Sequence, residues 1–414
     1  MSMDEMRTNG MYYGIDIGEK STLLSYYRRD MAEPVTVSSQ MGSEMYQIPT
    51  FLAKKRGVGQ WFFGNDAIRQ VQLSMAVGVD GLLEKARNKE YVLIDTEEYP
   101  AEDLLLIFLK KLLLVQGRVS GIPIAKLVIT VDVLDEVAIA LFTVLATRMG
   151  LETDQLLLLD HRECFYYYAL SQDPSLYLHD VLLYDYTQSH IRECLLKRNT
   201  STRPQVINMY FRNLGAVNFN KDRSFDDSIR KTLSGGLISA VYLIGDGFDG
   251  DWMKQSLQRL CQGRRVFIGK NLYSKGACYA GMVRDGILEW PFVYIGDNDL
   301  KLNVSLKVID HNEMGFVTLI SAGDSWYDAH GECEVILDGT PQIECWIQGP
   351  ESRKATVETI ELKGLPTREN RTTRLRISAK PRSDKEVVLV VADLGFGELC
   401  ASSGKSWEHV IKAG

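Results

Sequence analysis

Residues 12–27, YYGIDIGEKSTLLSYY, contain two apolar runs joined by a short polar turn, with Asp16 just before the turn. Residues 181–196, VLLYDYTQSHIRECLL, repeat this design with Asp185 in the matching place. Each segment predicts a β-hairpin, because aromatic and branched residues favour strands and the polar residues between them favour a turn. The repetition predicts a diverged duplication, and therefore two related halves.

The turns of the two hairpins can be aligned residue by residue. Superposition of the two aspartates places Gly18 over Thr187 and Lys20 over Ser189. Such a hairpin suits a metal–nucleotide, since turn amides point at phosphate oxygens while a carboxylate holds magnesium or its waters. The alternative interpretation is that both aspartates only initiate turns. A P-loop is excluded, because Glu19 separates glycine from lysine and a strand follows.

Helical and strand patterns alternate around the hairpins, which predicts an α/β fold. Gly150 ends one of the helices at a C-cap position. A polar, turn-rich stretch is expected from the end of the second hairpin to about residue 221. The predicted helices cover residues 101–116, 134–149, 226–233 and 251–260, and the predicted strands cover residues 126–131, 240–244 and 266–269.

Short strands replace helices after Pro291. Residues 374–379 alternate strictly between apolar and polar side chains, and residues 387–391 are wholly apolar. These patterns predict a β-sandwich-like domain over residues 300–414. The expected α/β domain then covers residues 1–295, with halves of about 1–175 and 176–295.

The bulk composition limits the function. A net charge of -7 over 414 residues argues against nucleic-acid and membrane-surface partners. The chain shows neither a leader pattern nor an apolar stretch long enough to cross a bilayer. Seven scattered cysteines without CxxC spacing indicate reduced thiols, so we expect a cytoplasmic protein without a structural metal.

A glycine-rich turn follows the predicted strand 240–244. Its residues Gly245, Gly247 and Gly250 have the GxGxxG spacing of a dinucleotide site, but no acidic residue ends the next strand. The turn can approach a nucleoside through its backbone, or it can simply pack tightly. Two other features, the aromatic run 165–168 and the basic run 363–385, are interpreted mainly as core packing and a solvated strand face.

The order of these motifs resembles the actin-like ATPase superfamily, and specifically the seventy-kilodalton heat-shock chaperones. The segments GIDIG, VLLYDYTQSH and AVYLIGDG are similar to the two phosphate motifs and the adenosine motif of that family. The segment IELKGLPTRENRTTRLRISAKPRSDKEVVLVVADLGFGE is similar to its β-sandwich peptide-binding domain. The resemblance implies a duplicated actin-like (ribonuclease H-like) fold followed by a peptide-binding sandwich.

The resemblance also implies a set of site residues. Asp16 and Asp185 would hold magnesium with ATP, and no catalytic residue is assigned, although that position falls near His161 or Glu163. The implied cofactor-binding residues are Gly14, Asp16, Gly18, Lys20, Ser21, Asp185, Thr187, Ser189, Gly245, Asp246 and Gly247.

The departures from the family limit the expected activity. Glu19 and Lys20 replace small hydroxyl residues, and side chains at 187–189 replace a glycine run. Only 60 positions separate Asp185 from Gly245, so the lobe that closes over adenine is missing, and the tail ends without a helical lid. We expect at most a weak ATPase.

Two functional hypotheses follow. The first is an ATP-binding, chaperone-like protein that couples a nucleotide cleft to a peptide or protein client bound by residues 300–414. The alternative is a pseudo-ATPase scaffold that turns over no nucleotide and acts through protein contacts. The oligomeric state and the identity of the client do not follow from the sequence.

Overall fold

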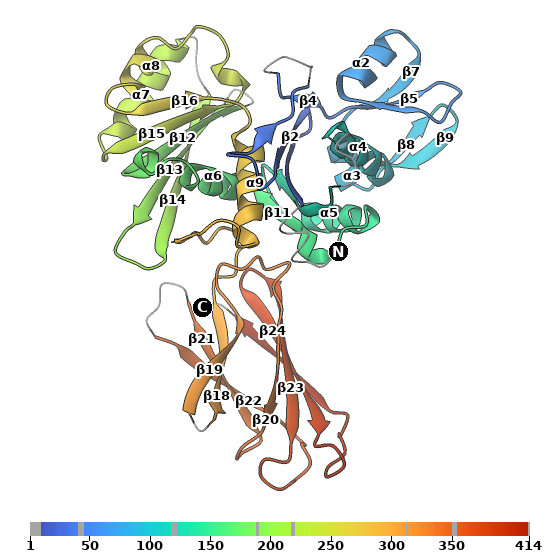
Figure 1. The fold of residues 1–414 in the computed structure, drawn as a ribbon, viewed down its shortest axis with the longest axis vertical. Coiled ribbons are helices and arrows are strands. Elements are labelled where there is room, and N and C mark those ends of the chain that lie inside the picture. The colour runs from blue at the N-terminus through green and yellow to red at the C-terminus, as the bar shows by residue number, and fades with distance from the viewer. Residues whose placement is uncertain are drawn as a thin grey trace. The chain divides into compact units, whose positions relative to one another are not determined.

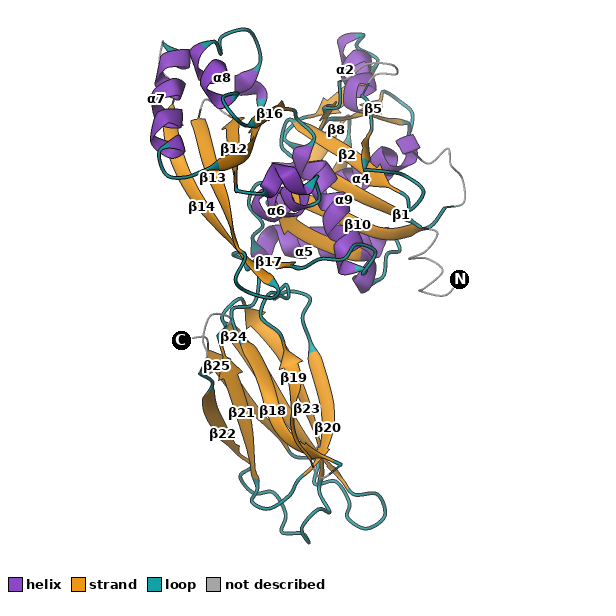
Figure 2. Cartoon of the chain, turned by 60° about the vertical axis from the view of Figure 1, so that its left-hand side comes forward, coloured by secondary structure: helices purple, strands orange, loops and turns teal. Residues whose placement is uncertain are grey.

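The structure is a computed structural model that describes residues 10–39, 45–116, 122–187, 190–216, 220–311, 313–349 and 354–412. The chain divides into two compact units, Met1–Phe292 and Val293–Gly414. The first unit is mixed α/β, and the second contains strands but, among its described residues, no helix (Figures 1 and 2). In the described part of the chain, no helix is long and apolar enough to cross a membrane.

The first sheet is built on the N-terminal hairpin. Strand β1 (Met11–Ile17) pairs with β2 (Ser21–Tyr27) in antiparallel fashion and with β10 (Ile124–Val131) in parallel. Strand β11 (Leu156–Asp160) continues the parallel side. The sheet order is β11-β10-β1-β2-β3, and β4 also pairs with β2. The two short strands are β3 (Val35–Thr36) and β4 (Ile48–Pro49).

The second sheet has the same order and strand directions around its own hairpin. Strand β12 (Asp180–Thr187) is antiparallel to β13 (His190–Asn199) and parallel to β15 (Ile238–Ile244), which is followed by parallel β16 (Arg265–Ile268). On the other side, β13 pairs with β14 (Gln205–Ala216). The short β17 (Phe292–Val293) completes the order β16-β15-β12-β13-β14-β17.

Two helices lie between the sheets of the first unit, α6 (His161–Leu170) and α9 (Leu272–Arg284) (Figure 1). Their close approach requires glycine. A Cβ atom on Gly14 of β1 would lie 2.1 Å from a backbone oxygen of α9, and one on Gly276 of α9 would lie 2.1 Å from a backbone oxygen of α6. The centre of the unit is therefore held together by backbone-to-backbone packing that no larger residue permits.

A smaller group of elements is attached to the first sheet. Strands β5, β6 and β7 form a three-stranded sheet, and β8 and β9 form a hairpin. The strands are β5 (Leu52–Lys55), β6 (Trp61–Phe63), β7 (Ala76–Val79), β8 (Tyr91–Ile94) and β9 (Glu97–Pro100), and the helices are α2 (Gly64–Gln72), α3 (Leu82–Arg87), α4 (Ala101–Gln116) and α5 (Glu136–Arg148).

Most predicted elements of the first unit are present. Both hairpins form, α4 spans the predicted residues 101–116, and α5 is followed by Gly150 with a φ of +82°. Helix α7 (Lys221–Leu233) starts five residues earlier than predicted, and α8 (Gln255–Leu260) starts four residues later. The helix N-terminus of α8 therefore does not directly follow the glycine-rich turn.

One prediction for this unit was wrong. The segment expected to be turn-rich contains β14, a strand of 12 residues. Its polar residues, such as Asn208 and Arg212, hide the strand pattern in the sequence. The long β13 supplies the hydrogen-bonding partner that makes this segment a strand, with Leu196 opposite Met209 and Cys194 opposite Phe211.

The second unit is a sandwich of two four-stranded antiparallel sheets that share one apolar core. Residues 374–379 of β23 alternate between buried and more exposed positions, as predicted, and the residues of β24 alternate between buried and half-buried positions. One sheet has the order β19-β18-β21-β22 and the other β20-β23-β24-β25. The strands are β18 (Asn303–Asp310), β19 (Glu313–Ile320), β20 (Gly331–Ile336), β21 (Gln342–Gln348), β22 (Thr356–Glu361), β23 (Arg374–Ser383), β24 (Glu386–Gly395) and β25 (Ser406–Lys412).

Candidate functional site

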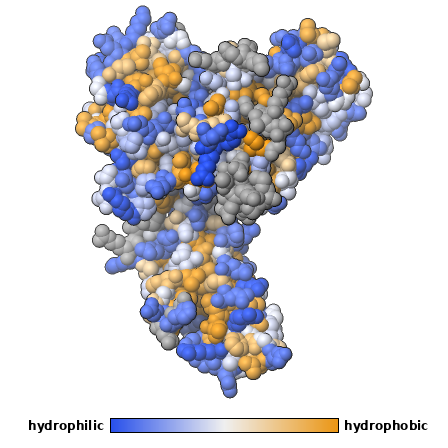
Figure 3. All heavy atoms as spheres, viewed as in Figure 1, coloured by the Kyte–Doolittle hydropathy of each residue, from blue (hydrophilic) through white to orange (hydrophobic). Residues whose placement is uncertain are grey.

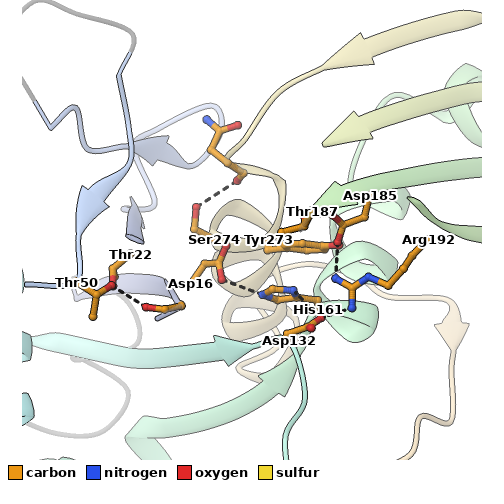
Figure 4. Close-up of polar contacts among 12 residues, drawn as sticks. Asp16, Thr22, Thr50, Asp132, His161, Asp185, Thr187, Arg192, Tyr273 and Ser274 are labelled. Atoms are coloured by element: carbon orange, nitrogen blue, oxygen red, sulfur yellow. Dashed lines mark hydrogen bonds and ion pairs between the residues drawn. The ribbon is translucent and has the colours of Figure 1, made fainter. Parts of the chain in front are cut away.

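Three polar side chains converge where the strands of the first sheet end. Asp16 lies near the end of β1, Asp132 directly follows β10, and His161 follows β11 as the first residue of α6. The carboxyl ends of parallel strands meet at one edge of a sheet, so the topology itself brings these residues together. Figure 4 shows the three side chains close together.

His161 joins the two aspartates. Its Nε2 lies 2.9 Å from Oδ1 of Asp16, and its Nδ1 lies 3.5 Å from Oδ1 of Asp132. The first distance is a hydrogen bond, whereas the second is an ion-pair distance that is too long for a well-formed hydrogen bond. The carboxylate of Asp16, which the resemblance assigns to magnesium, is therefore hydrogen-bonded to His161.

The aspartate of the second hairpin is also paired with a cation. Arg192, directly opposite Asp185 in the hairpin register, donates from Nη2 to its Oδ2 over 2.7 Å. The same guanidinium donates from Nη1 to Asp132 over 2.6 Å. Thr187 donates its hydroxyl to Asp185, and the phenol of Tyr273 donates to Asp185 over 3.2 Å.

These contacts form a continuous chain of alternating charge from the first hairpin to the second. It runs from Asp16 through His161, Asp132 and Arg192 to Asp185 (Figure 4). Tyr273 of α9 also stacks on the imidazole of His161, with ring centroids 3.9 Å apart and ring planes at 10°. The chain of five groups contains three carboxylates and two cations.

The charge chain sets the protonation states of its members. Burial lowers the pKa of His161, but the charges of Asp16 and Asp132 outweigh this effect and raise the pKa to about 10, so the ring is an imidazolium at neutral pH. Burial likewise opposes ionisation of Asp132, yet its contacts with His161 and Arg192 hold its pKa below the usual range. Burial raises the pKa of Tyr273 well above its usual value, which keeps the phenol as a donor.

Glu163, the other residue near the expected catalytic position, is a capping residue. Asp160 accepts a hydrogen bond from the amide of Glu163 over 2.9 Å, and Glu163 accepts one from the amide of Asp160 over 3.3 Å. This reciprocal pair is a capping box at the start of α6. His161, at the start of the same helix, contacts Asp16.

The four glycines expected near a cofactor have local structural roles. Gly14 allows the close approach of α9 to β1, as described above. The amide of Gly18 donates to the carbonyl of Ser21 over 3.0 Å within its own turn. A Cβ atom on Gly245 would lie 2.4 Å from the backbone oxygen of Tyr186, and one on Gly247 would lie 2.2 Å from the ring of the same tyrosine.

Most of the remaining predicted residues lie outside the charge chain. Lys20, Ser21 and Gly245 line one cavity of about 620 Å³. Asp246 accepts hydrogen bonds from Gln47 over 3.1 Å and from Lys270 over 2.9 Å, and the contact with Lys270 lowers its pKa. Thr187 contacts Asp185, as described above. Ser189 lies outside the described residues.

Sequence reasoning missed two members of the charge chain, Asp132 and Arg192, and the neighbouring Tyr273. Asp132 directly follows a predicted strand, and Arg192 lies opposite Asp185 in the predicted hairpin, so the sequence could have indicated both positions. Tyr273 lies at the start of α9, far along the chain, and nothing in the sequence points to it. Among the described residues, no three His, Cys, Asp or Glu side chains are grouped as ligands for a metal ion.

The fold and the site define a mixed α/β unit in which the aspartates of both hairpins contact cationic side chains of the same chain, followed by a β-sandwich. Residues 33–297 match the family described as a family of unknown function (DUF5716), C-terminal, and the chain belongs to this family. Residues 299–413 match a domain of unknown function (DUF8552). No curated protein matches the chain.

Proposed function

We propose that the first unit is a divergent actin-like fold, related to the heat-shock chaperones, that acts as a pseudo-ATPase scaffold rather than as a magnesium-dependent ATPase. The common order and directions of β2-β1-β10-β11 and β13-β12-β15-β16 support a duplicated fold of this type. The observation that carries the proposal is that both candidate magnesium ligands already have cationic partners.

The charge chain argues against magnesium at this position. Mg²⁺ binds through carboxylate oxygens while it keeps several of its waters. Here Asp16 faces an imidazolium, and Asp185 accepts from a guanidinium, a phenol and a hydroxyl. A divalent ion would have to displace two cations that neutralise these carboxylates in a low-dielectric site. The residues as placed therefore do not fit a magnesium–ATP site.

Calorimetric titration with ATP tests the scaffold proposal. We expect no binding of millimolar ATP with magnesium to the full chain. The matched variants are Asp16→Asn, in the charge chain, and Asp30→Asn, an exposed aspartate paired with Arg28. Magnesium-dependent binding that Asp16→Asn abolishes and Asp30→Asn preserves would overturn the proposal.

One observation favours a second candidate function, nucleotide binding without a metal. The cavity beside Lys20 has a volume of about 620 Å³, within the usual range for small-molecule sites. Lys20 and Lys270 bring two ammonium groups to its lining, although Lys270 is paired with Asp246 and Asp249. Titration with ATP in EDTA tests this candidate. Binding should be weakened by Lys20→Gln and kept by Glu19→Gln, and an equal effect of both variants would contradict it.

The second unit is proposed to carry the protein contacts. Its sheets end in four edge strands, β19, β22, β20 and β25, which offer unpaired backbone groups to an added strand. Apolar side chains of β19 and β22, including Met314, Phe316 and Val357, are exposed. On the face of this unit seen in Figure 3, hydrophobic and hydrophilic side chains are mixed. These features support binding of an extended peptide.

The basic run 363–385 is partly neutralised within the sandwich. Arg376 lies 2.9 Å from Glu334 and 3.5 Å from Glu332 on the neighbouring strand β20. Acidic flanks in the client should therefore add little affinity. Titration of isotope-labelled residues 300–414 with extended peptides, followed by NMR, tests the contact proposal. A folded fragment without any peptide-dependent shift would refute it.

A further inference from the structure

A second cavity lies in the first unit, between the start of α6 and strands β13 and β14. Its volume is about 250 Å³, and none of its lining residues lines the cavity beside Lys20. Helix α6 packs on the β15 side of the sheet, where Phe165 and Tyr168 contact Tyr242 edge-on. Strand β13 lies between β12 and β14 in the sheet (Figure 1). The helix therefore leaves a hollow over β13 and β14.

The floor of this cavity is apolar. Leu183, Cys194 and Phe211 lie side by side on three adjacent strands, because the register pairs Leu183 with Cys194 and Cys194 with Phe211. Phe165 of α6 closes the floor, and Val133 lies at the rim. Phe211 remains 43% exposed and Val133 67% exposed, so the rim is open to solvent. An apolar cavity of about 150 Å³ suffices for benzene, and this one has room for a ring with a short side chain.

The opposite wall carries an unused hydrogen-bond donor. Nδ1 of His161 is buried and has no hydrogen-bond partner, since Asp132 is 3.5 Å away and Asp16 takes the other ring nitrogen. Its nearest acceptor, Oδ1 of Asp132, lies at an ion-pair distance that is too long for a well-formed hydrogen bond. An acceptor oxygen placed in the cavity would supply this missing hydrogen bond.

The charged side chains that line the cavity bring several hydrogen-bond donors to a carboxylate, and His161, Arg192 and Arg212 each also contact a carboxylate of the protein. Four of the charged lining side chains are cationic and three are anionic. The cationic residues are His161, Arg162, Arg192 and Arg212, and the anionic residues are Asp132, Asp185 and Glu193. Arg162 also lies over the ring of Phe211, 4.3 Å from its centroid, so a guanidinium and an aromatic surface meet at the mouth.

We propose that this cavity binds a small aromatic carboxylate, with its ring on the apolar floor beside Phe211 and its carboxylate at Nδ1 of His161. The ligand would contact residues that follow strands of the first sheet as well as β13 and β14 of the second. Binding therefore ties the two halves of the first unit together and stabilises the folded protein by mass action. This proposal stands whether or not a nucleotide binds in the other cavity.

Fluorine NMR with para-fluorophenylacetate and the full chain tests the site. We expect the fluorine signal to broaden with the wild type. Phe211→Ala should weaken binding about tenfold through loss of the ring contact. Cys194→Met, which fills the floor, should weaken it as well. The matched control is Tyr210→Ala, because Tyr210 is the next residue on β14, is 56% exposed and does not line the cavity.

The outcomes distinguish binding of the probe in this cavity from nonspecific binding to the protein. Broadening that Phe211→Ala reduces and Tyr210→Ala preserves supports the proposal, and a weaker response to the neutral amide of the probe supports the role of the carboxylate. Absence of broadening at millimolar probe, or equal broadening with Phe211→Ala and Tyr210→Ala, overturns it. Phe211 is a surface residue, so loss of folding should not obscure its result.

Discussion

The stability of the first unit should fall steeply with alkaline pH because of His161. The pKa of this residue is about 10 in the folded protein and 6.5 in its ordinary state. The side chain is 17% exposed, so solvent screens the charge only weakly. Since the folded pKa is raised, the stabilisation is fully present below pH 6.5 and is lost as pH rises towards 10.

The magnitude follows from the difference in proton binding. Between these two pH values the folded state holds about one proton more than the unfolded state, so the free energy of unfolding falls by about 1.4 kcal/mol per pH unit. Over the whole interval the loss is about 4–5 kcal/mol. His161→Gln, which carries no charge, should lack this loss, be less stable than the wild type near pH 6.5 and converge with it near pH 10.

Urea unfolding at several pH values, followed by the helix band in circular dichroism, measures this effect. All helices among the described residues belong to the first unit, so the signal reports that unit. His179→Gln, at an exposed histidine, is the control and should keep the wild-type pH slope. Parallel pH profiles of the wild type and His161→Gln would refute the reasoning.

Two further predictions concern packing and a buried ion pair. Gly14→Ala should destabilise the first unit by about 3 kcal/mol, because its Cβ would collide with α9, whereas Gly59→Ala has no atom within 4 Å of its Cβ and should be near neutral in the same urea assay. Arg368→Met should destabilise the sandwich by about 3–5 kcal/mol, because it removes the two hydrogen bonds, of 2.8 and 2.9 Å, to the fully buried Asp393. Tryptophan fluorescence should report this loss, and an unchanged sandwich would contradict it.

Much of the architecture could be predicted from local patterns. The two hairpins, α4, α5, the alternating strand β23 and the apolar strand β24 all carry local sequence patterns typical of their structures. Strand β14 could not be predicted in the same way, because its polar residues show no strand pattern and its pairing with β13 decides its conformation. The late start of α8 similarly depends on Asp222 of α7, which accepts from the amides of Gln255 and Ser256 at the start of α8.

By itself, the sequence determined that two Asp-containing hairpins lie in an α/β unit ahead of a region of short strands. These features depend on residues that are close together along the chain. Only the tertiary structure decided what the two aspartates contact. His161 and Arg192 reach them because parallel strands end at one sheet edge and because the second hairpin places Arg192 opposite Asp185. The protonation of His161 depends on groups from different strands, so its charge is a property of the fold and not of any local segment.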